Sequence, residues 1–220
     1  MKSLRLAGIG AVAALALTAC GTSTDNNASS SSPSAMPSSM PSSAPMSSSS
    51  SGVTTNDQVF GPACSQLPQG SAPGSLDSMG PQPVASAAST NPLLTKLVAA
   101  VKATNLVDTL NSQQAITVFA PADPAFNALG DAKFKELAAN PGQLAPILQY
   151  HVAGKRYDAK GLEQAGTVTS LNTAGGPLKI EGSGDTMTVN GAKVLCGNIP
   201  TKNATVFVID KVLTPGTNKN

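Results

Sequence analysis

The residues TVFVIDKVL, numbered 205–213, predict a long β-strand near the end of the chain. Four of them, Val206–Ile209, are apolar without interruption, a pattern typical of a strand that is buried on both faces. Such a strand lies inside a sheet and not at its edge. The sequence therefore predicts a sheet with protein packed against both of its sides in this region.

Shorter strands precede this segment, because from about Val168 apolar residues alternate with polar ones, and a period of two is typical of strands. The alternating apolar residues are Val168 and Leu171, Leu178 and Ile180, and Met187 and Val189. Asn190-Gly191 is a strong signal for a tight hairpin turn, and residues 182–185 (GSGD) separate two of the strands. These strands are expected to pair antiparallel.

Helical spacing of apolar residues dominates the preceding part of the chain. A helix is predicted to begin at Asn91-Pro92, with Asn91 as its cap and Pro92 in the first position. Its apolar face comprises Leu93, Leu94, Leu97, Val98 and Val101, and a second short helix with Leu106, Val107 and Leu110 ends near Asn111.

A second β-type run, Ile116–Ala120, is closed by Pro121, and Asp123-Pro124 then starts another helix. The apolar residues of this helix and of two that follow are Phe126, Leu129, Phe134, Leu137, Leu144, Ile147 and Leu148. Three aromatic residues are expected in the core: Phe119, Phe126 and Phe207. Helices early in the chain and antiparallel strands late predict an α+β domain.

Residues 1–19 resemble a bacterial lipoprotein signal peptide. Lys2 and Arg5 give a positive start, and the apolar stretch Leu6–Leu17 is too short for a membrane span, which needs about 20 residues. The stretch ends in LTAC, residues 17–20, which resembles the lipobox at which a cysteine is acylated before cleavage. Cys20 is therefore the predicted lipidation site, and the protein is expected to be exported and anchored to the outer face of the cell membrane.

Residues 20–56 are expected to form a disordered linker, because Ser, Pro and Ala dominate them and offer little apolar surface for burial. The linker would lift residues 57–220, the predicted folded domain, off the membrane. Clustered Ser and Thr beside Pro are also compatible with O-glycosylation. Met36, Met40 and Met46 leave Cu(I) binding by thioethers open as an alternative.

Composition excludes several classes of function. Removal of the leader removes Lys2 and Arg5, and the remaining 12 basic residues balance 12 acidic ones, so no nucleic-acid partner is expected. One histidine and three cysteines, without the short spacings of zinc ligands, predict no metal site. The glycine motifs that bind nucleotide phosphates do not occur, so no cofactor is expected.

Cys64 and Cys196 remain once Cys20 is acylated, and export to an oxidising compartment favours a disulfide between them. A reactive catalytic thiol is the alternative, and it requires a basic partner nearby. Asn203 begins an N-glycosylation sequon, which we interpret as fortuitous because Thr205 starts a buried strand.

Three motifs together resemble the fasciclin I (FAS1) domain family: TVFAPADPAF at 117–126, YHV at 150–152 and ATVFVIDKVL at 204–213. The lipobox, the Ser/Pro-rich linker and the two late cysteines further resemble the mycobacterial-type fasciclin surface antigens. The resemblance implies a single fasciclin I domain of α+β class with a β-sandwich-like sheet. It also implies helices packed on one side of the sheet and the two signature strands as neighbours.

The resemblance implies adhesion and protein binding at a cell surface, without enzymatic activity. The implied partners are extracellular matrix, host or cell-surface proteins, such as collagen or integrin-like receptors, with Tyr150 and His151 as candidate contact residues. A carrier of a small apolar or cell-envelope ligand, held in a pocket between helices and sheet, is the alternative. A hydrolase that uses His151 is a third hypothesis.

His151 is the residue on which these hypotheses differ most. As the single histidine beside a helix-to-strand junction, it is a candidate general base. The structural interpretation is that its ring bonds a polar group of the first motif, with Asp123 as the expected partner, and fixes that turn against the sheet.

Overall fold

The computed structural model describes residues 52–216, and these residues comprise eight α-helices and seven β-strands. The predicted signal peptide, Cys20 and most of the predicted linker lie outside the described residues. The helices are α1 (Leu76–Met79), α2 (Val84–Thr90), α3 (Thr95–Ala103), α4 (Val107–Ser112), α5 (Asp123–Leu129), α6 (Asp131–Ala139), α7 (Pro141–Tyr150) and α8 (Ala159–Ala165). The strands are β1 (Ile116–Pro121), β2 (Val152–Ala153), β3 (Thr167–Val168), β4 (Leu178–Glu181), β5 (Thr188–Val189), β6 (Ala192–Pro200) and β7 (Ala204–Ile209). The predicted α+β class is confirmed.

The strands form one mixed sheet in the order β2-β1-β7-β6-β5-β4-β3. The two signature strands β1 and β7 are neighbours, as the resemblance implies, and they run parallel from Ile116 opposite Ala204 to Pro121 opposite Ile209. The other pairs in the sheet are antiparallel. The antiparallel pairing predicted for the late strands is therefore confirmed, and the parallel direction of the β1–β7 pair was not predicted.

The central strand β7 is buried along its whole length, as its apolar sequence predicts. Val206 and Val208 join a cluster of buried side chains from α2–α5 and α7, which we call the helix-side cluster. Phe207 and Ile209 point to the opposite face and join a strand-side cluster that contains buried residues of β3–β5 and α8. The domain therefore has a core on each side of its central strands.

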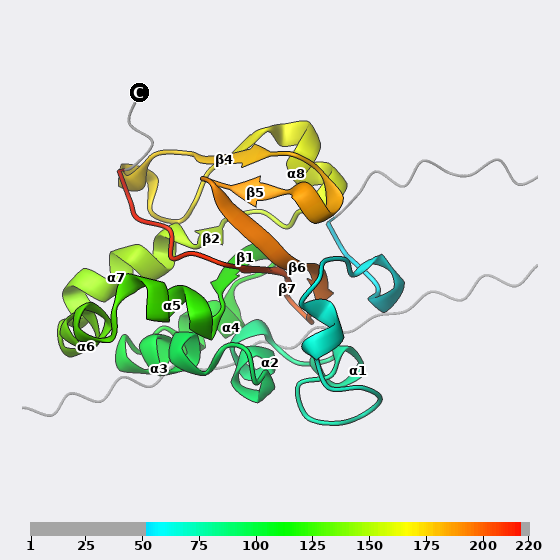
Figure 1. The fold of residues 1–220 in the computed structure, drawn as a ribbon, viewed down its shortest axis with the longest axis horizontal. Coiled ribbons are helices and arrows are strands. Elements are labelled where there is room, and N and C mark those ends of the chain that lie inside the picture. Colours follow the sequence, from blue (N-terminus) through cyan, green and yellow to red (C-terminus); the bar gives the residue numbers. More distant parts are fainter. Residues whose placement is uncertain (1–51, 217–220) are drawn as a thin grey trace, which may run out of the picture. The chain divides into compact units, whose positions relative to one another are not determined.

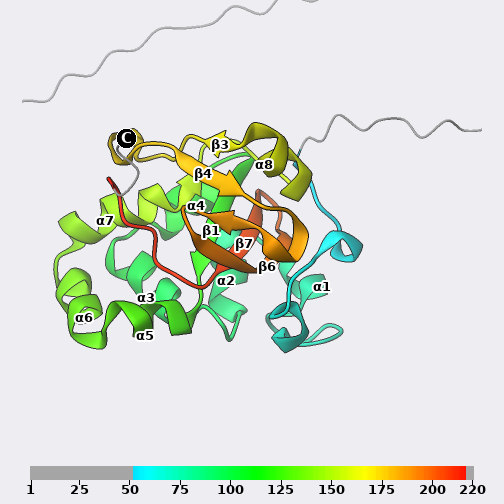
Figure 2. The ribbon, with the colours of Figure 1, turned by 45° about the horizontal axis from the view of Figure 1, so that its top comes forward.

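Figures 1 and 2 show the same arrangement from two directions, with α2–α7 on one side of the central strands. Strands β4 and β5 and helix α8 lie on the other side, so the sheet folds back over β6 and β7 in a sandwich-like manner. The resemblance implied helices on one side only, and α8 is the exception. Its buried residues Ala159 and Leu162 belong to the strand-side cluster.

Helix α3 begins at Thr95, three residues after the start predicted at Pro92. The side chain of Asn91 accepts a hydrogen bond from the Leu93 backbone N–H at 2.9 Å, which closes a turn where the helix was expected. The start of α3 is capped instead by Asp123, which lies far along the chain. Its carboxylate accepts from the backbone N–H of Lys96 and from the hydroxyl of Thr95. The start of α3 is therefore set by a tertiary contact with Asp123 and not by the local capping signal at Asn91-Pro92.

Both ends of the described fold differ from the sequence prediction. Strand β7 ends at Ile209, because its neighbour β1 ends opposite it at Pro121. At the start, the carbonyl of Gly52 accepts hydrogen bonds from Arg156 and from Thr205. Gly52 is therefore part of the folded unit, ahead of the boundary predicted at residue 57.

Candidate functional site

The last residue of the third motif, Leu213, and the end of α7 meet at the imidazole of His151. Helix α7 buries Leu144 and Leu148, and His151 is the residue that caps its C-terminus. The Nδ1–H of His151 donates to the carbonyl oxygen of Ile147, one turn earlier, at 2.8 Å. Nε2 accepts from the backbone N–H of Leu213, also at 2.8 Å. These two bonds place the proton on Nδ1 and tie α7 to the segment after β7.

Burial keeps the His151 ring neutral. It lowers the pKa of His151 from 6.5 to about 4, and the hydrogen bond to the Ile147 carbonyl, which favours the protonated ring, only partly opposes this effect. Both nitrogens are already bonded to backbone groups. Neither nitrogen can therefore accept the proton of a substrate in this arrangement.

Asp123 is not the partner of His151, and the predicted contact between them is wrong. The Asp123 carboxylate accepts from the backbone N–H of Lys96 at 2.8 Å and from the hydroxyl of Thr95. Both residues begin α3, where backbone N–H groups lack partners within the helix and the helix dipole favours a negative charge. Asp123 thus joins the start of α5 to the start of α3.

Tyr150 is fully buried and lies in the strand-side cluster. Its hydroxyl oxygen accepts from the side-chain amide of Asn190 at 2.9 Å. Its ring packs against Gly175, where an added Cβ would lie 2.6 Å from a ring carbon. Since His151 is also buried, neither side chain of the Tyr-His motif is presented to a protein partner.

An apolar cavity of about 160 Å³ lies between the helices and the sheet. Its walls are Val84, Ala85, Ser86, Ala88 and Ser89 of α2, Leu97, Val98, Val101 and Lys102 of α3, Val107 and Leu110 of α4, Val118 and Phe119 of β1, and Leu148, His151 and Val152. Helix α2 has the sequence VASAAST, and its small side chains leave space beside α3 and α4. The cavity is the kind of pocket that the carrier hypothesis requires, although the sequence does not identify its residues.

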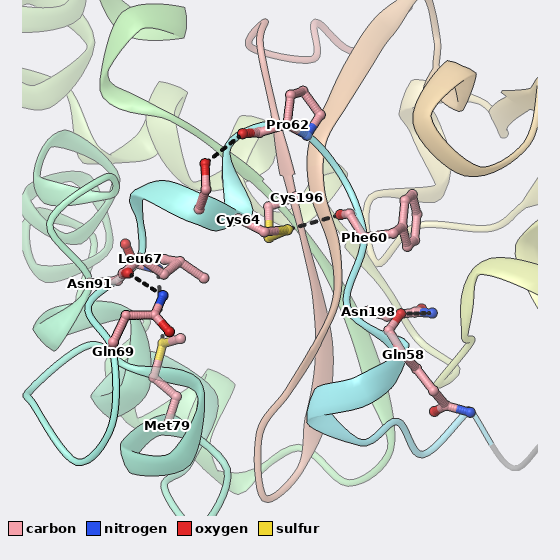
Figure 3. Close-up of a disulfide and its surroundings, with 11 residues drawn as sticks. Gln58, Phe60, Pro62, Cys64, Leu67, Gln69, Met79, Asn91, Cys196 and Asn198 are labelled. Carbon is pink, nitrogen blue, oxygen red and sulfur yellow. Dashed lines mark hydrogen bonds between the residues drawn. A yellow bond between two sulfur atoms is a disulfide. The ribbon is translucent and has the colours of Figure 1, made fainter.

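Residues 58–64 run alongside β6, and a disulfide between Cys64 and Cys196 joins them to it (Figure 3). The backbones of Phe60 and Gly197 exchange two hydrogen bonds, at 3.3 and 2.8 Å. The ring of Phe60 lies against Gly197, where a Cβ would be 2.5 Å from it, and it meets the ring of Phe207 with centroids 6.5 Å apart. With the disulfide formed, neither sulfur is a free thiol.

Within residues 52–216, no three His, Cys, Asp or Glu side chains converge as metal ligands would. No helix in this range is long and apolar enough to cross a membrane.

Comparison with known proteins identifies the fold family. The fasciclin domain model matches residues 92–215. Immunogenic protein MPB70 of Mycobacterium bovis is 42% identical over 165 residues, which are 71% of this chain and 82% of that protein. Cell surface glycolipoprotein MPB83 of the same species is 39% identical over 166 residues, which are 71% of this chain and 72% of that protein.

A solved FAS1 domain pair from the insect cell adhesion molecule fasciclin I is 20% identical, with a TM-score of 0.46. It matches 58% of this chain, which spans 46% of the longer insect chain. The family model covers the three motifs from which the resemblance was drawn. The chain belongs to the fasciclin domain family.

Proposed function

We propose that this chain is an exported protein of the cell surface that binds other molecules without transforming them. The names of two relatives, immunogenic protein MPB70 and cell surface glycolipoprotein MPB83, support this proposal. The proposal that the protein has no enzymatic activity rests on His151. Both nitrogens of its ring are hydrogen-bonded to backbone groups. A general base needs a nitrogen that can take a proton from the substrate, and this ring offers none.

The proposal includes a lipid anchor at Cys20, which follows the lipobox-like residues LTA. Palmitate supplied to expressing cells should label the wild type and leave Cys20→Ala unlabelled. Ser23→Ala is the matched control, because it changes a residue close to the anchor site and leaves Cys20 and the disulfide in place. Equal labelling of wild type and Cys20→Ala would contradict the anchor.

Extracellular matrix, host or cell-surface proteins are the proposed partners, with collagen and integrin-like receptors to be tested first. Within residues 52–216, Val53 and Leu171 are the only large apolar side chains that are exposed. A protein partner would therefore bind mainly through polar groups, and salt should weaken the complex. The immobilised chain carrying Cys20→Ala should retain such proteins at low salt and release them at high salt. Failure to retain any of them would count against adhesion.

A second candidate function is the binding of a small apolar ligand, and the cavity between α2, α3, α4 and the sheet favours it. Apolar cavities of this size stay free of water and take up apolar molecules. Native mass spectrometry of the exported protein should detect an apolar molecule bound in a ratio of one to one. A protein that stays empty in an excess of apolar ligand would exclude this function.

A further inference from the structure

We propose that the cavity holds the hydrocarbon chain of a free fatty acid, with Lys102 binding the carboxylate at the rim. This proposal rests on the second candidate function and names its ligand class.

The walls of the cavity favour a hydrocarbon over water. Among the wall residues described above, Ser86, Ser89 and Lys102 are polar, and His151 has both nitrogens occupied by backbone partners. A water molecule needs two to four polar partners to remain in a buried site, and the floor of the cavity supplies none. An engineered cavity of about 150 Å³ in another protein binds benzene, so the cavity here has room for a short run of methylene groups.

Lys102 gives the cavity one charged group, and it stands at the rim. Lys102 and Ser89 are exposed, whereas Val118, Phe119 and His151 are buried at the floor. A lysine can extend its aliphatic stem along an apolar wall while its ammonium group remains in water. An amphiphile that enters tail first would place its head group beside this ammonium.

No carboxylate within the described part of the chain forms an ion pair with the ammonium group of Lys102. The two ion pairs found there are Lys96 with Asp131 and Lys179 with Glu181. An apolar pocket with a single unpaired ammonium at its rim is complementary to a single hydrocarbon chain that carries one negative charge. A carboxylate fits this description, whereas an alcohol lacks the charge and an amine has the wrong sign.

The test titrates the folded chain with hexanoate, octanoate and decanoate, and with heptanol and heptylamine as head-group controls, because both carry the seven-carbon alkyl chain of octanoate. The chain has one histidine, so one His151 ring signal in NMR reports on the cavity floor. We expect each added methylene to lower Kd about fourfold until the cavity is full. Octanoate should bind more tightly than heptanol by up to about fivefold, the upper end of the range for an exposed ion pair.

Two variants separate the tail from the head group. Lys102→Ala should weaken octanoate binding to the level of heptanol and leave heptanol unchanged, whereas Lys160→Ala, an exposed lysine on α8, should change neither. Val98→Phe narrows the cavity and should weaken all ligands, provided that its melting temperature stays close to that of the wild type.

Each outcome is decisive. Equal binding of acid, alcohol and amine would overturn the role of Lys102 while the apolar-ligand function stands. A His151 signal that no ligand shifts would overturn both. A shift caused by phosphatidylglycerol vesicles, with none from free acids, would also overturn the proposal, because the ligand would then be a diacyl lipid.

Discussion

The Nε–H of Arg156 donates a hydrogen bond to the carbonyl oxygen of Gly52, and the two atoms lie 3.1 Å apart. The same nitrogen bonds Oγ1 of Thr205 at 3.0 Å, and Nη2 donates to the carbonyl oxygens of Thr201 and Ala204 at 3.0 and 2.9 Å. Arg156 is buried and has no carboxylate partner within residues 52–216. Neutral oxygens therefore surround this guanidinium, which joins Gly52 to the β6–β7 hairpin.

Arg156→Ala should lower the free energy of unfolding by about 3 kcal/mol, because it leaves several buried oxygens without partners. Arg156→Lys should recover only part of the loss, since an ammonium cannot copy the planar donor fork of arginine. Urea unfolding measures both changes. Lys202→Ala, an exposed lysine in the same hairpin, is the control and should stay within about 0.5 kcal/mol of wild type. Wild-type stability in Arg156→Ala would refute the importance of this contact.

The buried ring of His151 should make the protein less stable as the pH falls from 6.5 to about 4. Burial lowers the pKa of His151 in the folded chain, so in this window the unfolded chain takes up a proton that the folded chain excludes. The stability from the neutral ring is complete above pH 6.5 and declines by about 1.4 kcal/mol per pH unit below it, or roughly 3 kcal/mol in all.

Urea unfolding at a series of pH values measures this decline, and His151→Gln should show a smaller slope in the same window. If that variant does not fold, NMR titration of the single histidine of the wild type decides the question. A ring that titrates near its usual value of 6.5 would show that it is not held neutral by burial.

Loss of the disulfide should destabilise the protein by up to about 5 kcal/mol, because the bond closes a loop with a sequence separation of 132. The double variant Cys64→Ser, Cys196→Ser should therefore melt well below the wild type in oxidising buffer. Reductant should bring the wild type close to the double variant and leave the double variant unchanged, which provides an internal control. Equal melting temperatures in oxidising buffer would contradict the prediction.

Asn203 should be essential for stability and should carry no glycan. Its Oδ1 accepts from the Val84 backbone N–H at 2.9 Å, and its amide donates to the carbonyls of Leu110 and Gln113, each at 2.8 Å. Asn203→Ala leaves these groups unpaired and should cost about 3 kcal/mol by urea unfolding. The exposed Gln114→Ala is the control. A glycan found at Asn203 by mass spectrometry would be incompatible with this buried network.

The sequence predicts the elements whose signal is local. The apolar run Val206–Ile209 identifies a buried central strand, and the three core phenylalanines are buried as expected. Helices α1, α2 and α8 are not predicted, because α1 has four residues and the small or polar residues of α2 and α8 give few apolar side chains at helical spacing. For α8 a signal was present, since Asp158 caps the helix by accepting from the Gly161 N–H at 2.7 Å.

The site is harder to predict than the fold. The partners of His151 are backbone groups of Ile147 and Leu213, and the contact with Leu213 depends on the path of the chain after β7. The cavity depends on space that Ala85 and Ala88 leave unfilled, and unfilled space has no sequence signature before the helices are placed. The sequence therefore identifies His151, Tyr150 and Asp123, but it identifies neither their hydrogen-bond partners nor the residues of the cavity.

The covalent link between Cys64 and Cys196 also determines how the domain would respond to mechanical load. A pull on the chain ahead of Cys64 and behind Cys196 passes through the sulfur–sulfur bond and bypasses the residues between them. That closed ring contains α1–α8 and therefore the helical walls of the cavity. A surface protein under tension from flow or from a bound partner would thus keep residues 64–196, which include all eight described helices, from being extended by that tension.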